Sequence, residues 1–184
     1  MESLEPYPSL ALAILAGLLI GLEREQTRPA PETARGFVGG IRTYPIIALM
    51  GAVAALLAPS YGPWVVVTAG IGLSLLLAMT YWRDSGTGHL GVTSESSALL
   101  TFLLGALAAS PSIISPLSRR IFVVASIAVA ATVLLSTKTQ LRALSSKISK
   151  EDIIATLKFL LVSVVVMPLL PDEALGPYGV LNPF

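Results

Sequence analysis

Long apolar stretches without charged residues recur along the chain, and short segments between them hold most of its charges. A helix needs roughly 17–25 apolar residues to cross about 30 Å of hydrocarbon. Stretches of this kind predict about six transmembrane helices, near residues 7–23, 43–58, 63–82, 95–111, 120–137 and 153–170. The last of them is the weakest, because it contains Lys158. The expected fold class is all-α: a polytopic transmembrane helix bundle that forms a single domain over residues 1–184.

The second and third of these helices come from one charge-free region, residues 43–82. Pro59-Ser-Tyr-Gly-Pro63 interrupts this region, and Pro with Gly breaks a helix. Two helices joined by a tight turn are therefore expected. Composition supports a lipid-facing surface, since 12% of residues are charged against roughly a quarter in soluble domains. A net charge of +1 gives no electrostatic footprint for nucleic acid.

The basic residues predict how the chain crosses the membrane. Ten of the twelve Lys and Arg residues fall on one side, when Lys158 is counted there, and only Arg119 and Arg120 fall on the other. Lys and Arg concentrate in cytoplasmic loops, so both termini are expected outside. The basic segment 138–152 has spaced Leu and Ile residues. It is either a short amphipathic helix on the inner surface, drawn to anionic lipid, or a solvated linker.

Gly17 and Gly21 give the first helix a face of small residues, with Ala13 one turn earlier. Glycines spaced by four allow two helix backbones to approach closely in lipid. Packing inside the chain is favoured for this face, and a dimer seam is the alternative.

Charged residues follow this face directly, at Glu23-Arg24-Glu25. They either mark where the helix meets water or lie partly in the bilayer, where ionisable groups are usually paired or functional. A pair of Arg42 with Glu23 or Glu25 is one arrangement that the sequence allows. Glu95 is expected in the first turn of the fourth helix, which Thr93 or Ser94 would cap.

A metal site is the sharper alternative for the carboxylates. Glu23, Glu25, Asp84 and Glu95 would gather on the inner face with the Thr43 hydroxyl. Such oxygen ligands suit Mg²⁺ or Ca²⁺, although Arg24, Arg42 and Arg83 could neutralise the same carboxylates. No cofactor is expected unless these carboxylates bind a metal ion, for which Mg²⁺ is the candidate. His89 has no partner at metal-ligand spacing, and no HExxH or GxSxG motif occurs, so the chain is not expected to be an enzyme.

Two motifs, GLLIGLERE at residues 17–25 and GIRT at residues 40–43, resemble the MgtC/SapB family of bacterial and archaeal membrane proteins. Four downstream stretches are similar to the long branch of that family, which carries a second membrane domain of unknown function: AMTYWR at 78–83, TSESSALLTFLLG at 93–105, MPLLP at 167–171 and GPYGVLNP at 176–183. The family-signature positions would be Gly17, Gly21, Glu23, Arg24, Glu25, Gly40, Arg42 and Thr43.

The resemblance implies a multi-pass protein of the plasma membrane, the inner membrane in bacteria with two membranes. Family members are associated with growth at low magnesium and, in some cases, with regulation of the membrane ATP synthase. Members of the long branch continue with further membrane helices, so this chain would be a naturally split protein or an amino-terminal half.

Two functions are expected from these observations. The first is a regulatory or scaffold membrane protein that acts through helix–helix contacts, as a homo-oligomer, with a dimer favoured, or with a second membrane domain. The alternative is a divalent-cation transporter or channel subunit for Mg²⁺. Transport sites usually lie near mid-membrane, yet the span centres hold only small hydroxyls, a point against the alternative.

Overall fold

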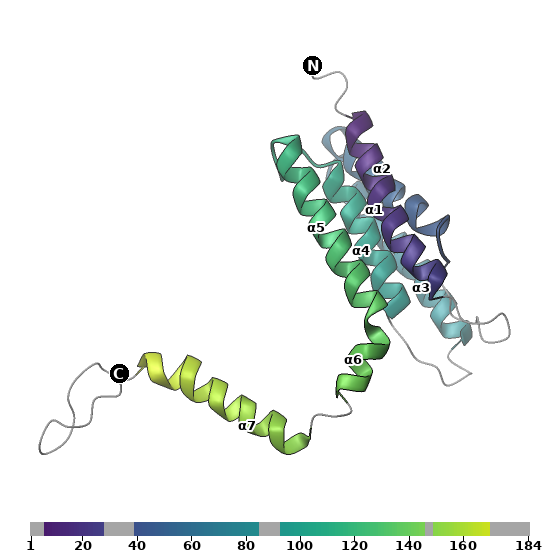
Figure 1. Cartoon of the computed structure of the whole chain (residues 1–184). Helices are drawn as coiled ribbons and strands as arrows, with labels where there is room; N and C mark the ends of the chain where they lie inside the picture. Colours follow the sequence, from purple (N-terminus) through teal and green to yellow (C-terminus); the bar gives the residue numbers. More distant parts are fainter. Residues whose placement is uncertain (1–5, 28–38, 85–92, 146–148, 170–184) are drawn as a thin grey trace, which may run out of the picture. The chain divides into compact units, whose positions relative to one another are not determined.

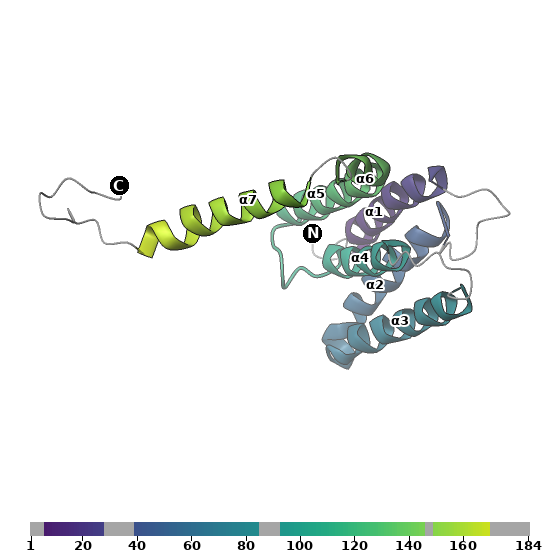
Figure 2. The same cartoon turned by 90° about the horizontal axis from the view of Figure 1, so that it is seen from below.

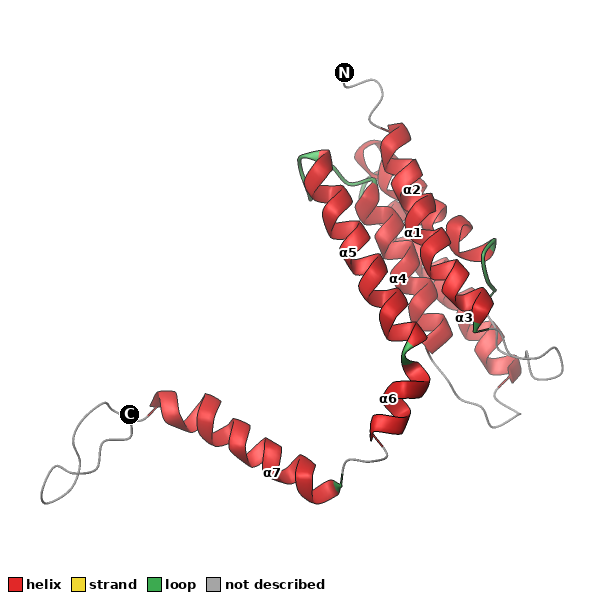
Figure 3. Cartoon of the chain, in the orientation of Figure 1, coloured by secondary structure: helices red, strands yellow, loops and turns green. Residues whose placement is uncertain are grey.

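The structure, a computed structural model, describes residues 6–27, 39–84, 93–145 and 149–169, all of them helices and short connections (Figure 3). It divides into two units, Met1–Thr137 and Lys138–Phe184. The first unit contains α1 (Pro6–Gln26), α2 (Thr43–Tyr61), α3 (Trp64–Asp84), α4 (Thr93–Ala108) and α5 (Leu117–Ser136). The second contains α6 (Lys138–Ser145) and α7 (Lys150–Leu160), which continues as a π-helical segment, Leu161–Val166, and a 3₁₀ turn, Met167–Leu169. That the two units form one transmembrane domain remains a prediction.

The first unit is an up-and-down bundle in which consecutive helices run in opposite directions (Figures 1 and 2). Helices α1, α2 and α4 all contact one another and form its centre. Helix α3 packs on α2 and α4, and α5 packs on α1 and α4. One end of the bundle therefore gathers the last turns of α1 and α5 with the first turns of α2 and α4.

Each of the six predicted spans overlaps a helix, and the all-α class is confirmed. Among the described residues, α1, α2 and α5 are long and apolar enough to cross a membrane. Residues 64–80 of α3 and all of α4 form shorter apolar helices. Helix α7 and its continuation are present where the sixth span was predicted, with no buried residue. Membrane crossing by α3, α4 and α7 remains a prediction.

The break between α2 and α3 lies later than the sequence suggested. Helix α2 continues through Pro59 to Tyr61, although Pro59 lacks the N–H that would donate to the Ala55 carbonyl oxygen. The chain then reverses at Gly62, whose φ of +89° is a left-handed value that suits glycine. The tight turn is confirmed, and Gly62 provides its reversal.

Glycines bring the three central helices into backbone contact. A Cβ atom on Gly17 would lie 2.7 Å from the Pro45 Cα and 2.8 Å from the Tyr44 carbonyl oxygen. A Cβ on Gly51 would overlap the Phe102 carbonyl oxygen, and one on Gly105 would overlap the Ala48 carbonyl oxygen. The small-residue face of α1 is therefore buried against α2 within the chain, which confirms the favoured interpretation of Gly17 and Gly21.

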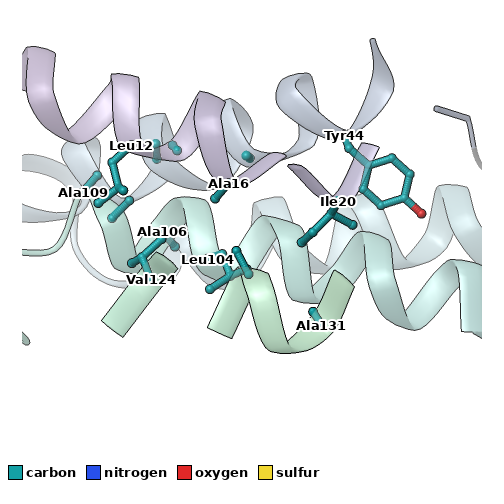
Figure 4. Close-up of a cluster of buried hydrophobic side chains, with 14 of the residues drawn as sticks. Leu12, Ala16, Ile20, Tyr44, Leu104, Ala106, Ala109, Val124 and Ala131 are labelled. Atoms are coloured by element: carbon teal, nitrogen blue, oxygen red, sulfur yellow. The ribbon is translucent and has the colours of Figure 1, made fainter. Parts of the chain in front are cut away.

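Alanine fills most of the remaining space between these helices (Figure 4). Ala13, Ala48 and Ala108 are fully buried, and larger side chains such as Ile20 and Leu104 close the gaps. Side chains of this size keep the backbones close and maximise dispersion contacts, which are the main source of helix association in lipid.

We predict that Gly105→Val destabilises the bundle, because the new side chain would push α4 away from the Ala48 carbonyl group. The expected loss is at least about 2 kcal/mol, as for overpacked cores. Thermal unfolding of the purified protein in detergent measures it. Gly72→Ala is the matched control, since a Cβ there meets nothing within 4 Å and alanine favours the helix. Equal melting temperatures for the two variants would contradict the packing described here.

Candidate functional site

Polar side chains are buried where α1 ends and α2 and α4 begin. Glu23 and Arg24, in the last turn of α1, are 6% and 7% exposed. Glu95, in the first turn of α4, is 9% exposed. The placements of Arg24 and Glu95 suit the helix dipoles, because a cation is stabilised at a helix C-terminus and a carboxylate at an N-terminus. The side chains of Glu23 and Arg24 are therefore packed inside the protein, while the place where α1 meets water remains a prediction.

Arg24 connects α1 to α4. Its Nη2 donates a hydrogen bond to the Ser94 Oγ, and its Nη1 lies 4.0 Å from the Glu23 Oε2. The Thr27 hydroxyl donates to the carbonyl oxygens of Glu23 and Arg24, at 3.1 and 3.3 Å, and so satisfies part of the helix end. Arg24 is therefore held in place by Glu23, its neighbour in α1, and by Ser94 at the start of α4.

Tyr44 connects α2 to the same turn of α4. Its ring is fully buried, and its hydroxyl lies 2.6 Å from the Ser97 Oγ and 3.3 Å from the Ser94 carbonyl oxygen. A fully buried phenol needs such partners to avoid the cost of desolvation. Glu23 and Arg24 are buried at the same end of the bundle. We call the group Glu23, Arg24, Tyr44, Ser94 and Ser97 the polar clamp, because it joins the ends of three helices.

Glu25 ties α1 to the residues that precede α2. Its Oε2 accepts a hydrogen bond from the Ile41 N–H at 3.4 Å, and the same carboxylate occupies the space that a Cβ on Gly40 would need. Gly39 has a φ of +114°, another left-handed value. The Gly40 carbonyl accepts from the N–H groups of Thr43 and Tyr44 and starts α2. Glu25 therefore holds the residues before α2 in place, and Gly40 in turn accepts the first hydrogen bonds of that helix.

Some predicted relationships are absent. Arg42 is exposed and forms no ion pair in the described part of the chain, so the suggested pair with Glu23 or Glu25 is not found. The Ser94 hydroxyl accepts a hydrogen bond from the Arg24 guanidinium, whereas the sequence predicted only a helix-capping role for Ser94. Across the same described ranges, no group of three Asp, Glu, His or Cys side chains lies close enough to hold a metal ion. The side chain of Asp84 and all of His89 lie outside the described residues.

A second buried arginine, which the sequence analysis missed, lies at the opposite end of the bundle. Arg120, in the first turn of α5, is 1% exposed, and its Nη2 donates to the Ser9 Oγ of α1 at 3.2 Å. It precedes Val124, Ala128, Ala131 and Leu135, all buried at intervals of three or four residues. That periodicity places position 120 on the packed face of α5 and could have distinguished it from exposed Arg119.

We predict that Arg24→Leu destabilises the protein by about 3 kcal/mol, because breaking a buried pair leaves the other charge uncompensated. Arg42→Leu removes the same charge from an exposed position, where substitutions usually have little effect. Unfolding of both variants in detergent, compared with Glu23→Gln and the Glu23→Gln/Arg24→Leu double variant, gives the coupling energy. Additive single effects would show that Glu23 and Arg24 do not act together.

Searches of curated proteins and of solved structures found no significant match. The model of the MgtC family matches residues 10–144, from α1 to the end region of α6. This match covers most of the chain and includes every residue of the polar clamp. The chain belongs to the MgtC family.

Proposed function

We propose that this protein is a regulatory or scaffold membrane protein, linked to magnesium homeostasis or membrane energetics, that acts through helix–helix contacts. The observation that carries the proposal is the closed interior of the bundle. Glycine and alanine hold α1, α2 and α4 in backbone contact, which leaves a hydrated ion no space between these three helices.

The hydroxyl groups within the helices support the same conclusion. Thr68, Ser74, Thr101 and Thr132 each donate to the carbonyl oxygen four residues earlier, at 2.7–2.8 Å. Bonds of this kind satisfy a hydroxyl inside its own helix. A groove of about 430 Å³ between α2 and α3 is lined by apolar side chains, from Ile46 to Ala69. A dehydrated divalent ion would find no carboxylate in it.

The helix faces that point away from the bundle supply the contact surface. Leu15 of α1 and Phe122 of α5 are largely exposed, as are many large apolar residues of α3 and α7. Such faces are stable against lipid and equally against another apolar helix. We propose a homo-oligomer, with a dimer favoured, or association with a second membrane domain. Gly17 and Gly21 face α2, so the contact uses other residues.

The alternative function is a divalent-cation transporter or channel subunit. Its support is the burial of two carboxylates, Glu23 and Glu95, at one end of the bundle, since buried ionisable groups in membrane proteins often mark ion pathways. The Glu95 Oε2 has no hydrogen-bond partner among the described residues. A cation-transport site at this end of the bundle would need further metal-binding side chains from another copy of the chain or from another domain.

Ion flux separates the two functions. We expect liposomes containing the purified protein to show no Mg²⁺ flux above protein-free liposomes, because the interior offers no polar path. Glu23→Gln and Arg42→Ala are measured alongside, the first in the buried cluster and the second exposed. Flux in the unchanged protein that Glu23→Gln abolishes would favour the transporter.

Association is tested by cross-linking. The chain contains no cysteine, so Leu15→Cys places one thiol on the exposed face of α1. We expect a disulfide-linked dimer for this variant or for Phe122→Cys on α5, and none for Ala13→Cys, which is buried inside the bundle. Monomers throughout, in native membranes as well as in detergent, would exclude the homo-oligomer.

We further propose that both termini face the outside of the cell. The end of the bundle that holds the polar clamp would then face the cytoplasm, together with Arg42, Arg83 near the end of α3 and the basic segment that follows α5. Tags at the two termini should both react with a membrane-impermeant reagent in intact cells. Tags that report opposite compartments would overturn this topology.

A further inference from the structure

Helix α6 separates its apolar and polar positions more strongly than any other of the helices α1 to α7. Positions 141 and 144 lie three residues apart and share one face, whereas positions 138 and 142 lie four apart on a neighbouring face. Leu141 is 47% exposed, and Lys138 is exposed beside it in the helix. The helix therefore presents an apolar residue next to a basic position.

The charge around this helix has one sign. Residues 138–150 contain Lys138, Arg142, Lys147 and Lys150 and no acidic residue. Only Thr137 separates this helix from α5, a candidate membrane span of twenty residues. Lys138 thus closely follows an apolar helix that is long enough to cross the hydrocarbon layer.

Helix α6 is separate from the helix that follows it, because α7 has its own N-terminal cap. Ser149 and Asp152 form a reciprocal capping box, in which the Asp152 N–H donates to the Ser149 Oγ and the Ser149 N–H donates to the Asp152 carboxylate. A new helix, α7, therefore starts at Lys150, and its exposed apolar residues make it unlike α6. The short amphipathic helix stands between two apolar ones.

We propose that α6 lies in the headgroup layer of the membrane face at which α5 ends and binds anionic phospholipid there. Leu141 enters the apolar boundary, and Lys138 and Lys150 contact lipid phosphates. A short basic helix with low hydrophobicity and separated faces is the kind that lies in this layer. A solvated linker gains nothing from such separation, and a helix packed on protein gains nothing from uniform positive charge.

The experiment uses the full chain in lipid vesicles. Because the sequence has no cysteine, Leu141→Cys and Ala143→Cys each carry one spin label, on nearly opposite sides of α6. Accessibility to oxygen and to a water-soluble nickel chelate is measured in phosphatidylcholine vesicles and in vesicles that also contain phosphatidylglycerol. We expect the label at 141 to gain oxygen access and lose nickel access when the anionic lipid is present, and the label at 143 to stay accessible to nickel.

Charge removal provides the second measurement. The ratio of inserted to exposed label at 141 should fall about five-fold for each cation lost in Lys138→Gln and Lys150→Gln. Arg119→Gln, an exposed change near the other end of α5, is the matched control and should leave the ratio unchanged.

Three results would overturn the proposal. Equal nickel access at 141 and 143 would identify a solvated linker. Protection at 141 from both reagents, independent of lipid charge, would identify packing on protein. Insertion that does not depend on anionic lipid would remove the role of the cations. The comparison of the two vesicle compositions needs no lysine variant, so it stands even if those variants fold poorly.

Discussion

Direct contact between helix backbones is the constraint on which the rest of this bundle depends. Lipid tails are as apolar as leucine, so burial alone gives helices little reason to associate in a membrane. Gly17 places α1 against the start of α2, and Gly51 and Gly105 let the backbones of α2 and α4 pack directly against each other. The close approach then brings the ends of these helices within hydrogen-bonding distance, which makes the polar clamp possible.

The polar groups at the two ends of the bundle fix how far each helix is shifted along its neighbours, which a core of alanine and glycine does not specify by itself. Alanine and glycine pack well in several registers, because they differ little in shape. Arg24 with Ser94 at one end, and Arg120 with Ser9 at the other, can form their bonds in only one register. A buried arginine is costly when its partners are lost. The dispersion contacts therefore hold the helices together, and the arginines select one arrangement among several.

Much of this could be predicted from the sequence, and the failures have physical causes. The helices and the turn near Gly62 follow from hydropathy and from glycine, which are local properties. The burial of the Gly17 and Gly21 face could be favoured but not decided, because a partner helix of the same chain and one of another copy look alike in sequence. Tyr44, Ser97 and Arg120 were missed as partners, since their bonds join residues 53 and 111 positions apart. Arg119 and Arg120 cannot be told apart by counting basic residues in loops. Only the helical periodicity of α5 shows that one is exposed and the other buried.

The short reversal at Gly62 has a consequence for biogenesis. Helices α2 and α3 are joined so closely that they emerge in direct succession during synthesis. Residues 43–82 contain no charge, so no ionised group has to be carried across the hydrocarbon. The pair can thus enter the membrane as one helical hairpin during translation, and α2 reaches the bilayer with its glycine-containing face ready to receive α4, which is synthesised later.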